Sequence, residues 1–215
     1  MPERRFYVSR AGLKLEHALR EFGIDPTGLV CADFGCNVGG FTDCLLQHGA
    51  ARVYAIDTGY GTLAWKLRQD PRVVVMERTN ALHVHPPAPQ PSPGGRGSPE
   101  VEGSQSVDLV TIDLGWTPQR LAIPAALRWL KLDGRIITLI KPHYELTDEE
   151  RKTLLVDGSL SEAEALRIFE RSVASMPALG VEVVKTARSP IRGGKSSKGR
   201  ADAGNIEFLA LLKRR

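Results

Sequence analysis

The stretch "LVCADFGCNVGGFTDCLLQHG" (residues 29–49) passes from an apolar run through a glycine-rich loop into a helical pattern. The run 29–34 is almost entirely apolar, as expected of a parallel-sheet strand that is covered on both faces. Glycines between a strand and a helix let the backbone approach a ligand that a Cβ would repel, and the helix N-terminus adds oriented N–H groups. The stretch therefore predicts a strand, a loop and a helix that bind a nucleotide-like ligand.

Apolar runs of the same kind recur through the middle of the chain, at residues 52–57, 72–76, 107–113 and 135–141. Between them lie patterns that suit crossover helices, at residues 39–49, 61–70 and 118–134, the last ending at Gly134. A further helix is expected before the first strand, over residues 9–23, with Ser9 as its cap and Gly23 at its end. This alternation predicts an α/β fold with a mostly parallel sheet.

The last part of the chain ends the pattern differently. Residues 161–180 predict a helix that begins with a capping box of Ser161 and Glu164, and strands are expected at 181–187 and 206–212. No helix separates these strands, so they should pair antiparallel at one edge of the sheet. A mostly parallel seven-stranded sheet with an antiparallel last strand resembles the Rossmann-like class I S-adenosylmethionine-dependent methyltransferase plan, whereas NAD-binding domains lack that closing hairpin.

Composition limits the class of protein. A chain of 215 residues with 42% hydrophobic content predicts one domain over residues 1–215, and the net charge of +4 favours an anionic partner without naming it. The chain start lacks the apolar stretch of a signal peptide, and no apolar run is long enough to span a membrane. We therefore expect a soluble, cytoplasmic protein without a membrane role.

Two segments interrupt the alternation. Residues 84–106 are mostly Pro, Gly, Ser and polar residues, which predicts a disordered surface insertion. Residues 189–204 are rich in Lys and Arg and lead directly into the last strand. This basic loop could hold phosphates, and a solvated loop is the alternative.

The spacing of the glycine loop narrows its ligand. Gly35 to Gly40 reads G-x-x-x-G-G, which matches neither the dinucleotide G-x-G-x-x-G nor the G-K-[ST] ending of a phosphate loop. Asp57 ends the second predicted strand, where a carboxylate can accept both hydroxyls of a ribose. Asp33 can attract the ammonium or sulfonium of S-adenosylmethionine, a cation that no pyrophosphate cofactor offers. The two acids favour the methyl donor over NAD and ATP.

Four further polar residues are candidates for the chemistry. Asp113 and Lys141 end the fourth and fifth predicted strands, where parallel α/β sheets bind their ligands. Lys14 lies at the margin of the apolar face of the first helix, and Glu207 interrupts the last apolar strand, where a charge in an edge strand needs a partner. Taken singly, each has an ordinary structural explanation as a surface charge or a turn former.

Together these residues resemble a known family. "YVSRAGLKLEHAL" (7–19), the stretch from "ADFGCNVGG" to "MERTN" (32–80), "DLVTIDLGW" (108–116), "LIKPHYE" (139–145) and "GNIEFLALL" (204–212) resemble the motifs of the FtsJ-like ribose 2'-O-methyltransferases. The likeness is greatest to the TlyA-type (haemolysin A-like) ribosomal RNA branch. The resemblance implies S-adenosyl-L-methionine as the cofactor and a catalytic tetrad of Lys14, Asp113, Lys141 and Glu207. It implies a donor site formed by Asp33, Gly35, Cys36, Asn37, Gly39, Gly40, Phe41, Asp57, Asn80 and Asp113.

The resemblance also has two departures. TlyA-type proteins usually carry an S4-like RNA-binding domain before this region, and only eight residues precede Ser9 here. RNA would then be held by the catalytic domain or by a partner. The segment "LGWTPQR" after Asp113 replaces the usual "LSFISL" on the substrate side, which leaves the target base open.

The implied reaction assigns roles to the tetrad. A ribose hydroxyl is a weak nucleophile and needs a base, for which we expect Lys141, its pKa lowered by partial burial and by the second cation at Lys14. Asp113 would orient this lysine, and Glu207 would hold a lysine or the ribose. RNA, expected to be ribosomal RNA or a ribosomal subunit, would contact a set of cations: Arg4, Arg5, Arg10, Arg192, Lys195, Lys198 and Arg200.

Other functions remain open at this stage. A class I methyltransferase acting on a small-molecule or protein hydroxyl would carry the same donor loop. A non-catalytic RNA-binding or haemolysin-like, pore-forming protein is the alternative from another class, although no amphipathic membrane helix supports it. His83 and His85 have a metal-ligand spacing without an evident third ligand, and the three cysteines form no C-x-x-C, so no metal is expected. The oligomeric state is left open.

Overall fold

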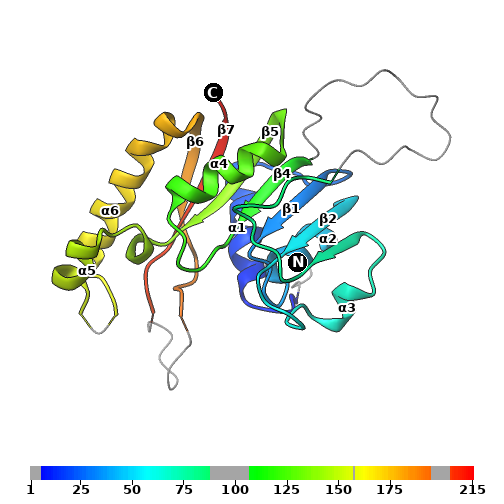
Figure 1. Cartoon of the computed structure of the whole chain (residues 1–215), viewed down its shortest axis with the longest axis horizontal. Coiled ribbons are helices and arrows are strands. Elements are labelled where there is room, and N and C mark those ends of the chain that lie inside the picture. Colours follow the sequence, from blue (N-terminus) through cyan, green and yellow to red (C-terminus); the bar gives the residue numbers. More distant parts are fainter. Residues whose placement is uncertain (1–5, 88–106, 157, 195–203) are drawn as a thin grey trace.

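The computed structural model describes residues 6–87, 107–156, 158–194 and 204–215. Its strands form one sheet of seven in the order β3-β2-β1-β4-β5-β7-β6 (Figure 1). The strands are β1 (Val30–Phe34), β2 (Arg52–Ile56), β3 (Val73–Met76), β4 (Val107–Ile112), β5 (Leu130–Ile140), β6 (Val181–Arg188) and β7 (Phe208–Arg214). The helices are α1 (Ala11–Phe22), α2 (Gly40–Gln47), α3 (Trp65–Arg68), α4 (Gln119–Trp129), α5 (Asp148–Leu154) and α6 (Glu162–Ser175), with short 3₁₀ helices η1 (Pro142–Tyr144) and η2 (Met176–Leu179).

The strand directions confirm the predicted fold class. β1 pairs parallel with β2 and β4, β2 with β3, and β4 with β5. β7 runs antiparallel to both β5 and β6. The predicted pairing of the last two strands is therefore confirmed, but β7 is not an edge strand, because it lies between β5 and β6. Glu207 directly precedes β7 and does not interrupt it.

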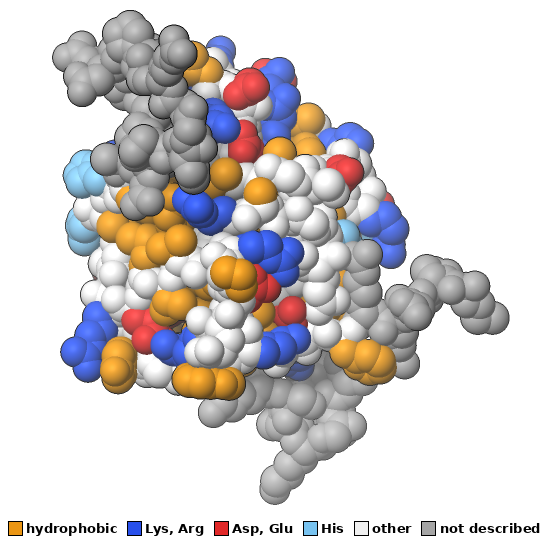
Figure 2. Space-filling model, turned by 90° about the vertical axis from the view of Figure 1, so that its right-hand side faces the viewer, with side chains coloured by type: hydrophobic (Ala, Val, Ile, Leu, Met, Phe, Trp, Pro, Cys, Tyr) orange, Lys and Arg blue, Asp and Glu red, His pale blue; other side chains and the backbone are white. Residues whose placement is uncertain are grey.

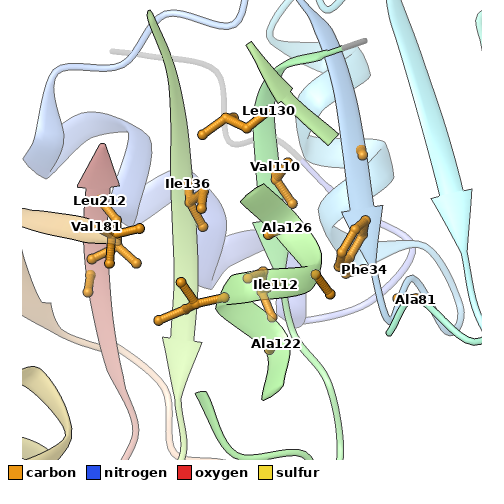
Figure 3. Close-up of a cluster of buried hydrophobic side chains, with 14 of the residues drawn as sticks. Phe34, Ala81, Val110, Ile112, Ala122, Ala126, Leu130, Ile136, Val181 and Leu212 are labelled. Atoms are coloured by element: carbon orange, nitrogen blue, oxygen red, sulfur yellow. The ribbon is translucent and has the colours of Figure 1, made fainter. Parts of the chain in front are cut away.

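Helices cover both faces of the sheet, which explains why the central strands β1 and β4 are mostly buried and apolar, whereas the edge strand β6 is largely exposed. One buried cluster joins α4 and α6 to the sheet, and Figure 3 shows Ala122 and Ala126 of α4 against Val110 and Ile112 of β4. The other cluster joins α1 and α2 to the opposite face. In Figure 1, α4 accordingly crosses in front of the strands and α1 lies behind them. Small alanines on α4 let its backbone approach the sheet closely.

Several predicted elements have different ends in the structure. The helix expected to reach Gly134 stops at Trp129, and β5 already begins at Leu130, which pairs with Val107 of β4. Because Leu130 joins the sheet, its apolar side chain serves the strand rather than the helix. Ser9 does not cap α1 with its side chain, since the N-cap is Arg10.

The capping residues explain two other helix starts. α5 was not predicted, although Thr147 and Glu150 form a capping box that "TDEE" could have signalled. At α6, the Ser161 hydroxyl accepts the N–H of Glu164, which is one half of the predicted capping box; the Glu164 carboxylate accepts from Arg167 instead of from the backbone of Ser161.

Part of the chain lies outside the described ranges. The predicted insertion at 84–106 falls mostly there, because only residues 84–87 of it are described. The basic loop is described up to Gly194 and again from Gly204. None of the helices within the described ranges is long and apolar enough to cross a membrane.

Candidate active site

The carboxyl ends of four parallel strands form the floor of the largest cavity. Gly35 follows β1, Asp57 follows β2, Asp113 follows β4 and Lys141 follows β5, and all four line a cavity of about 650 Å³. The cavity volume falls within the range of about 300–1,000 Å³ that is usual for small-molecule sites. A doubly wound sheet is expected to bind its ligand at this edge. Four of the predicted site residues thus line one cavity at these strand ends.

The glycine loop provides a backbone surface in this cavity. Gly35 has a φ of 87°, and a Cβ there would lie 2.7 Å from the carbonyl oxygen of Asp113. A side chain at this position would therefore meet a fixed backbone atom and would also strain the left-handed conformation. Asn37 has a φ of 48° in the same loop. The chain thus requires a glycine where β1 and β4 come closest below the cavity.

The loop fixes the carboxylate of Asp57. Its Oδ2 accepts the backbone N–H of Asn37 at 2.9 Å, and its Oδ1 accepts that of Gly59 at 2.7 Å. Two N–H donors hold both oxygens without an ion pair among the described residues. The remaining lone pairs of this carboxylate can accept two neighbouring hydroxyls, as on a ribose.

The structure brings most of the predicted donor-site residues to the cavity wall. Asn80 lines it on the far side of Asp57, and its side-chain oxygen accepts the N–H of Leu82 at 2.9 Å. The predicted residues in the wall are Gly35, Cys36, Asn37, Gly40, Phe41, Asp57, Asn80 and Asp113. Gly39 is not in the wall: it lies beneath it with a φ of 102°, where a Cβ would lie 2.8 Å from Leu63 Cδ1.

The structure does not bring Asp33 to the cavity. Its side chain is fully buried, with Oδ2 accepting from the Thr42 hydroxyl at 2.7 Å and Oδ1 from the Thr111 hydroxyl at 3.0 Å. Burial raises the pKa of Asp33 to about 7, although these hydrogen bonds act to lower it. The expectation that Asp33 attracts a ligand cation is not supported, because the carboxylate faces Thr111 on the adjacent strand rather than the cavity.

The four predicted catalytic residues meet in the same cavity as two ion pairs. Lys14 of α1 donates to Glu207 at 2.5 Å, with both side chains buried. Lys141 contacts Asp113 at 2.5 Å, and its Nζ also donates to the carbonyl of Leu114 at 3.2 Å. All four side chains line the same cavity. The sequence placed two of them at strand ends, and the tertiary structure adds the other two from the chain termini.

The electrostatics differ from the expectation for Lys141. Burial lowers its pKa, but the Asp113 carboxylate, with a smaller effect from Glu207, outweighs burial and raises the pKa above its ordinary value. The predicted lowering is therefore wrong for this state. Lys14 does not supply the expected repulsion because Glu207 neutralises it. Burial in turn raises the pKa of Glu207, although Lys14 opposes this change.

Sequence reasoning missed residues that shape the tetrad. Gly193 packs directly on the Glu207 carboxylate, because a Cβ on Gly193 would lie 2.7 Å from Glu207 Cδ. The antiparallel bridge between Gly193 and Asn205 brings the two segments together, a tertiary contact that no sequence pattern signals. Other wall residues that were not predicted include Ser9, Ala11, Val38, Thr58, Gly59, Thr79, Leu114, Trp116 and Gly194. The glycines of "TGYG" (58–61) after β2 were the one available signal for part of this set.

The rim of the cavity carries an exposed aromatic side chain. Trp116, in the segment that departs from the family pattern, has a φ of 59° and is 78% exposed. Its ring centroid lies 5.0 Å from that of Tyr144, which supports the indole from one side. Across the face shown in Figure 2, Lys and Arg side chains are scattered between exposed hydrophobic ones rather than gathered in one patch.

The cations predicted to contact RNA are only partly described. Arg10 is exposed beside the N-terminus of α1, and Arg192 donates to the carbonyl of Gly204 at 3.4 Å. The other predicted cations, Arg4, Arg5, Lys195, Lys198 and Arg200, lie outside the described residues. Within the described ranges, no three His, Cys, Asp or Glu side chains are grouped so as to hold a metal ion.

Comparison with known proteins finds relatives that match nearly the whole chain. The YqxC protein of Bacillus subtilis is 41% identical over 209 residues, which cover 96% of this chain and 65% of that protein. The 16S/23S rRNA (cytidine-2'-O)-methyltransferase TlyA of Mycobacterium tuberculosis is 37% identical over 211 residues, covering 97% of this chain and 69% of TlyA. The chain thus spans about two thirds of the length of the curated relatives it matches.

A solved structure and a family model also match most of this chain. A candidate hemolysin from Streptococcus thermophilus superposes with a TM-score of 0.80 at 34% identity, over 100% of this chain and 69% of that one. The model of the FtsJ-like methyltransferase family matches residues 7–198, which include three of the four predicted catalytic residues. The chain therefore belongs to the FtsJ-like methyltransferase family.

Proposed function

We propose that this protein transfers a methyl group from S-adenosylmethionine to a ribose 2'-hydroxyl of ribosomal RNA in the cytoplasm. The observation that carries the proposal is the meeting of two ion pairs, the buried Lys14–Glu207 pair and the partly buried Lys141–Asp113 pair, in the cavity that the glycine loop also lines. The loop suits a nucleoside, and the ion pairs suit a hydroxyl that must lose a proton.

The residues of the glycine loop fit the methyl donor. Gly35 and Gly40 keep the backbone free of side chains, and the Asp57 carboxylate is held in place by two N–H groups at the point where a ribose would lie. Asn80, with Ala81 and Leu82, would border the adenine. When bound, S-adenosylmethionine supplies a methyl group on a positively charged sulfur. The glycine loop at residues 35–40 lacks the G-K-[ST] ending of a phosphate loop, which argues against ATP at this loop.

The tetrad residues would position and deprotonate the acceptor. Lys141 Nζ is the proposed proton acceptor for the hydroxyl, and Asp113 and the Leu114 carbonyl fix its direction. Because Asp113 raises the pKa of Lys141, the amine carries a proton in this state and must release it before it can act as a base. Lys14 and Glu207 would hold the ribose. The buried pair leaves both side chains few alternative conformations, which favours positioning.

The names of the relatives are consistent with this acceptor. The TlyA protein of M. tuberculosis is a 16S/23S rRNA (cytidine-2'-O)-methyltransferase. The match covers 97% of this chain and 69% of TlyA. The exposed indole of Trp116 at the rim gives a flat surface for a nucleobase, since stacking on an aromatic side chain contributes about 1–3 kcal/mol per base. No described residue points to a particular target base.

Methyl transfer can be tested with labelled S-adenosylmethionine and ribosomal RNA. Nuclease digestion then locates the label on a ribose or elsewhere. We expect labelled 2'-O-methyl nucleosides from the native protein and a rate lower by about 10²–10⁴ for Lys141→Met, the usual contribution of general acid–base catalysis. Lys152→Met, which changes an exposed lysine of α5 outside the cavity, is the matched control and should keep the native rate.

The outcomes separate the proposal from its alternatives. Label on a base would contradict the ribose assignment. Label on a small-molecule or protein hydroxyl, with none in RNA, would favour the second enzyme class. A Lys141→Met protein that binds donor and keeps the native rate would show that Lys141 is not the base.

A further inference from the structure

A second cavity adjoins the first on the acceptor side of the tetrad. It has a volume of about 350 Å³, and Lys141, Glu207, Trp116 and Gly194 form part of the wall of both cavities. The tetrad therefore lies on the boundary between the two. The second cavity is further lined by His143, Tyr144, Arg151, Leu155, Gly158 and Asn205.

The charged side chains that line this second cavity differ in whether they have a partner of opposite charge. Lys141 is paired with Asp113, and Glu207 is paired with Lys14. Burial, together with the nearby charges of Lys141 and Arg151, lowers the pKa of His143 to about 4, so that its imidazole is neutral at pH 7. Among the described residues, Arg151 has no carboxylate partner. Within the described part of the chain it is therefore the one charged side chain of this wall without an opposite charge.

The guanidinium of Arg151 also has unused hydrogen-bond donors. Its Nε donates to the carbonyl of Leu146 at 3.4 Å and its Nη2 to that of Tyr144 at 3.5 Å, both long contacts. Within the described part of the chain, Nη1 makes no hydrogen bond. The adjacent acid on α5, Glu150, is already engaged by Arg171. An arginine with free N–H groups, beside a neutral histidine and two compensated ion pairs, suits an anion with several oxygens.

We propose that Arg151 binds an RNA phosphate next to the acceptor ribose and so positions the strand over the tetrad. This inference rests on the proposed function and names a positioning residue for it. The Lys141 amine and the Arg151 guanidinium line one small cavity, so a ribose at Lys141 would bring its own phosphodiester into this cavity. The backbone contacts of Arg151 to Tyr144 and Leu146 hold it against η1, the element that follows Lys141.

The test compares Arg151→Gln with Arg135→Gln. Arg135 is a matched control because it is also partly buried, its described hydrogen bonds go only to backbone carbonyls, and it lines neither cavity. RNA affinity is measured across a salt series for each protein. A lost phosphate contact should reduce the slope of log K against log salt by about 0.7–0.9, whereas a structural change alone would not alter the slope.

Kinetics complete the test. We expect Arg151→Gln to raise KM for RNA about tenfold with little change in kcat, and to leave the affinity for S-adenosylhomocysteine unchanged, as expected of a lost charged hydrogen bond outside the donor site. Arg151→Lys should restore part of the salt slope, because it keeps the charge. Inorganic phosphate at millimolar concentration should not compete with RNA, because the proposed site takes a phosphodiester of the bound strand. Full competition would indicate a simple anion site and overturn the proposal.

Each outcome has a separate meaning. A salt slope for Arg151→Gln equal to that of the native protein overturns the inference and leaves the proposed function intact. If the native protein and Arg151→Gln differ in salt slope as expected, but the native protein transfers no methyl group, the proposed function is overturned and the phosphate contact stands. A native protein without RNA affinity overturns both.

Discussion

The buried carboxyl of Asp33 makes stability depend on pH in a way that one substitution should remove. In the folded chain its pKa is about 7, whereas an exposed aspartate has an ordinary pKa of 3.8. A folded-state pKa above the unfolded value means that the protonated group stabilises the fold. This stabilisation is complete below about pH 4 and is lost progressively as the pH rises to about 7.

The magnitude follows from the difference of about 3 pH units between the folded and unfolded pKa values. At 1.36 kcal/mol per unit, the free energy of unfolding should fall by about 4 kcal/mol from this group as the pH rises from 4 to 8. Asp33→Asn removes the titration and keeps a side chain that can exchange hydrogen bonds with Thr42 and Thr111. The variant should therefore gain about 4 kcal/mol relative to the native protein over this pH range.

Urea unfolding of both proteins, at intervals between pH 4 and pH 8, measures this difference directly. Asp133→Asn is the control, because Asp133 is exposed and its side chain makes no hydrogen bond in the described part of the chain. Its free energy difference from the native protein should stay constant with pH. A constant difference for Asp33→Asn as well would refute the reasoning and would indicate that Asp33 is ionised in the folded state throughout.

Three further outcomes follow from the site. The methyl-transfer rate should rise with pH through the neutral range, because Asp113 raises the pKa of Lys141 and the base is its neutral form; a flat pH–rate profile would argue against this. Glu207→Gln leaves Lys14 charged and buried without a partner and should lower the free energy of unfolding, measured in urea, by about 3–5 kcal/mol. Gly35→Ala should abolish S-adenosylhomocysteine binding in calorimetry, since the added Cβ meets the Asp113 carbonyl.

The donor half of the site was predictable because it is local in sequence. Gly35, Asp57, Asp113 and Lys141 each follow a strand, and parallel strands bring their carboxyl ends to one edge of the sheet. An apolar run and the residue after it are therefore enough to place such a side chain. The same reasoning cannot tell which way a strand residue faces, and for this reason Asp33, two residues before Gly35, was expected in the cavity but lies in the core.

The acceptor half depends on contacts between distant parts of the chain. Lys14 and Glu207 are 193 residues apart, and they meet because α1 packs on the sheet beside β7, the strand that follows Glu207. The sequence marked them as candidates through their positions beside apolar faces and through resemblance to a family, but neither signal showed that they contact each other. The pKa of Lys141 likewise depends on which carboxylate each lysine contacts, and the pairing seen here reversed the expected direction.

By itself, the sequence determined the α/β alternation, the antiparallel ending and the glycine loop, because hydrophobic periodicity and backbone freedom are local properties of the chain. Only the tertiary structure decided the burial of Asp33, the two ion pairs, the contact of Gly193 with Glu207 and the uncompensated charge of Arg151. Burial and charge pairing depend on the distances between side chains from different elements, and those distances exist only once the helices have packed on the sheet.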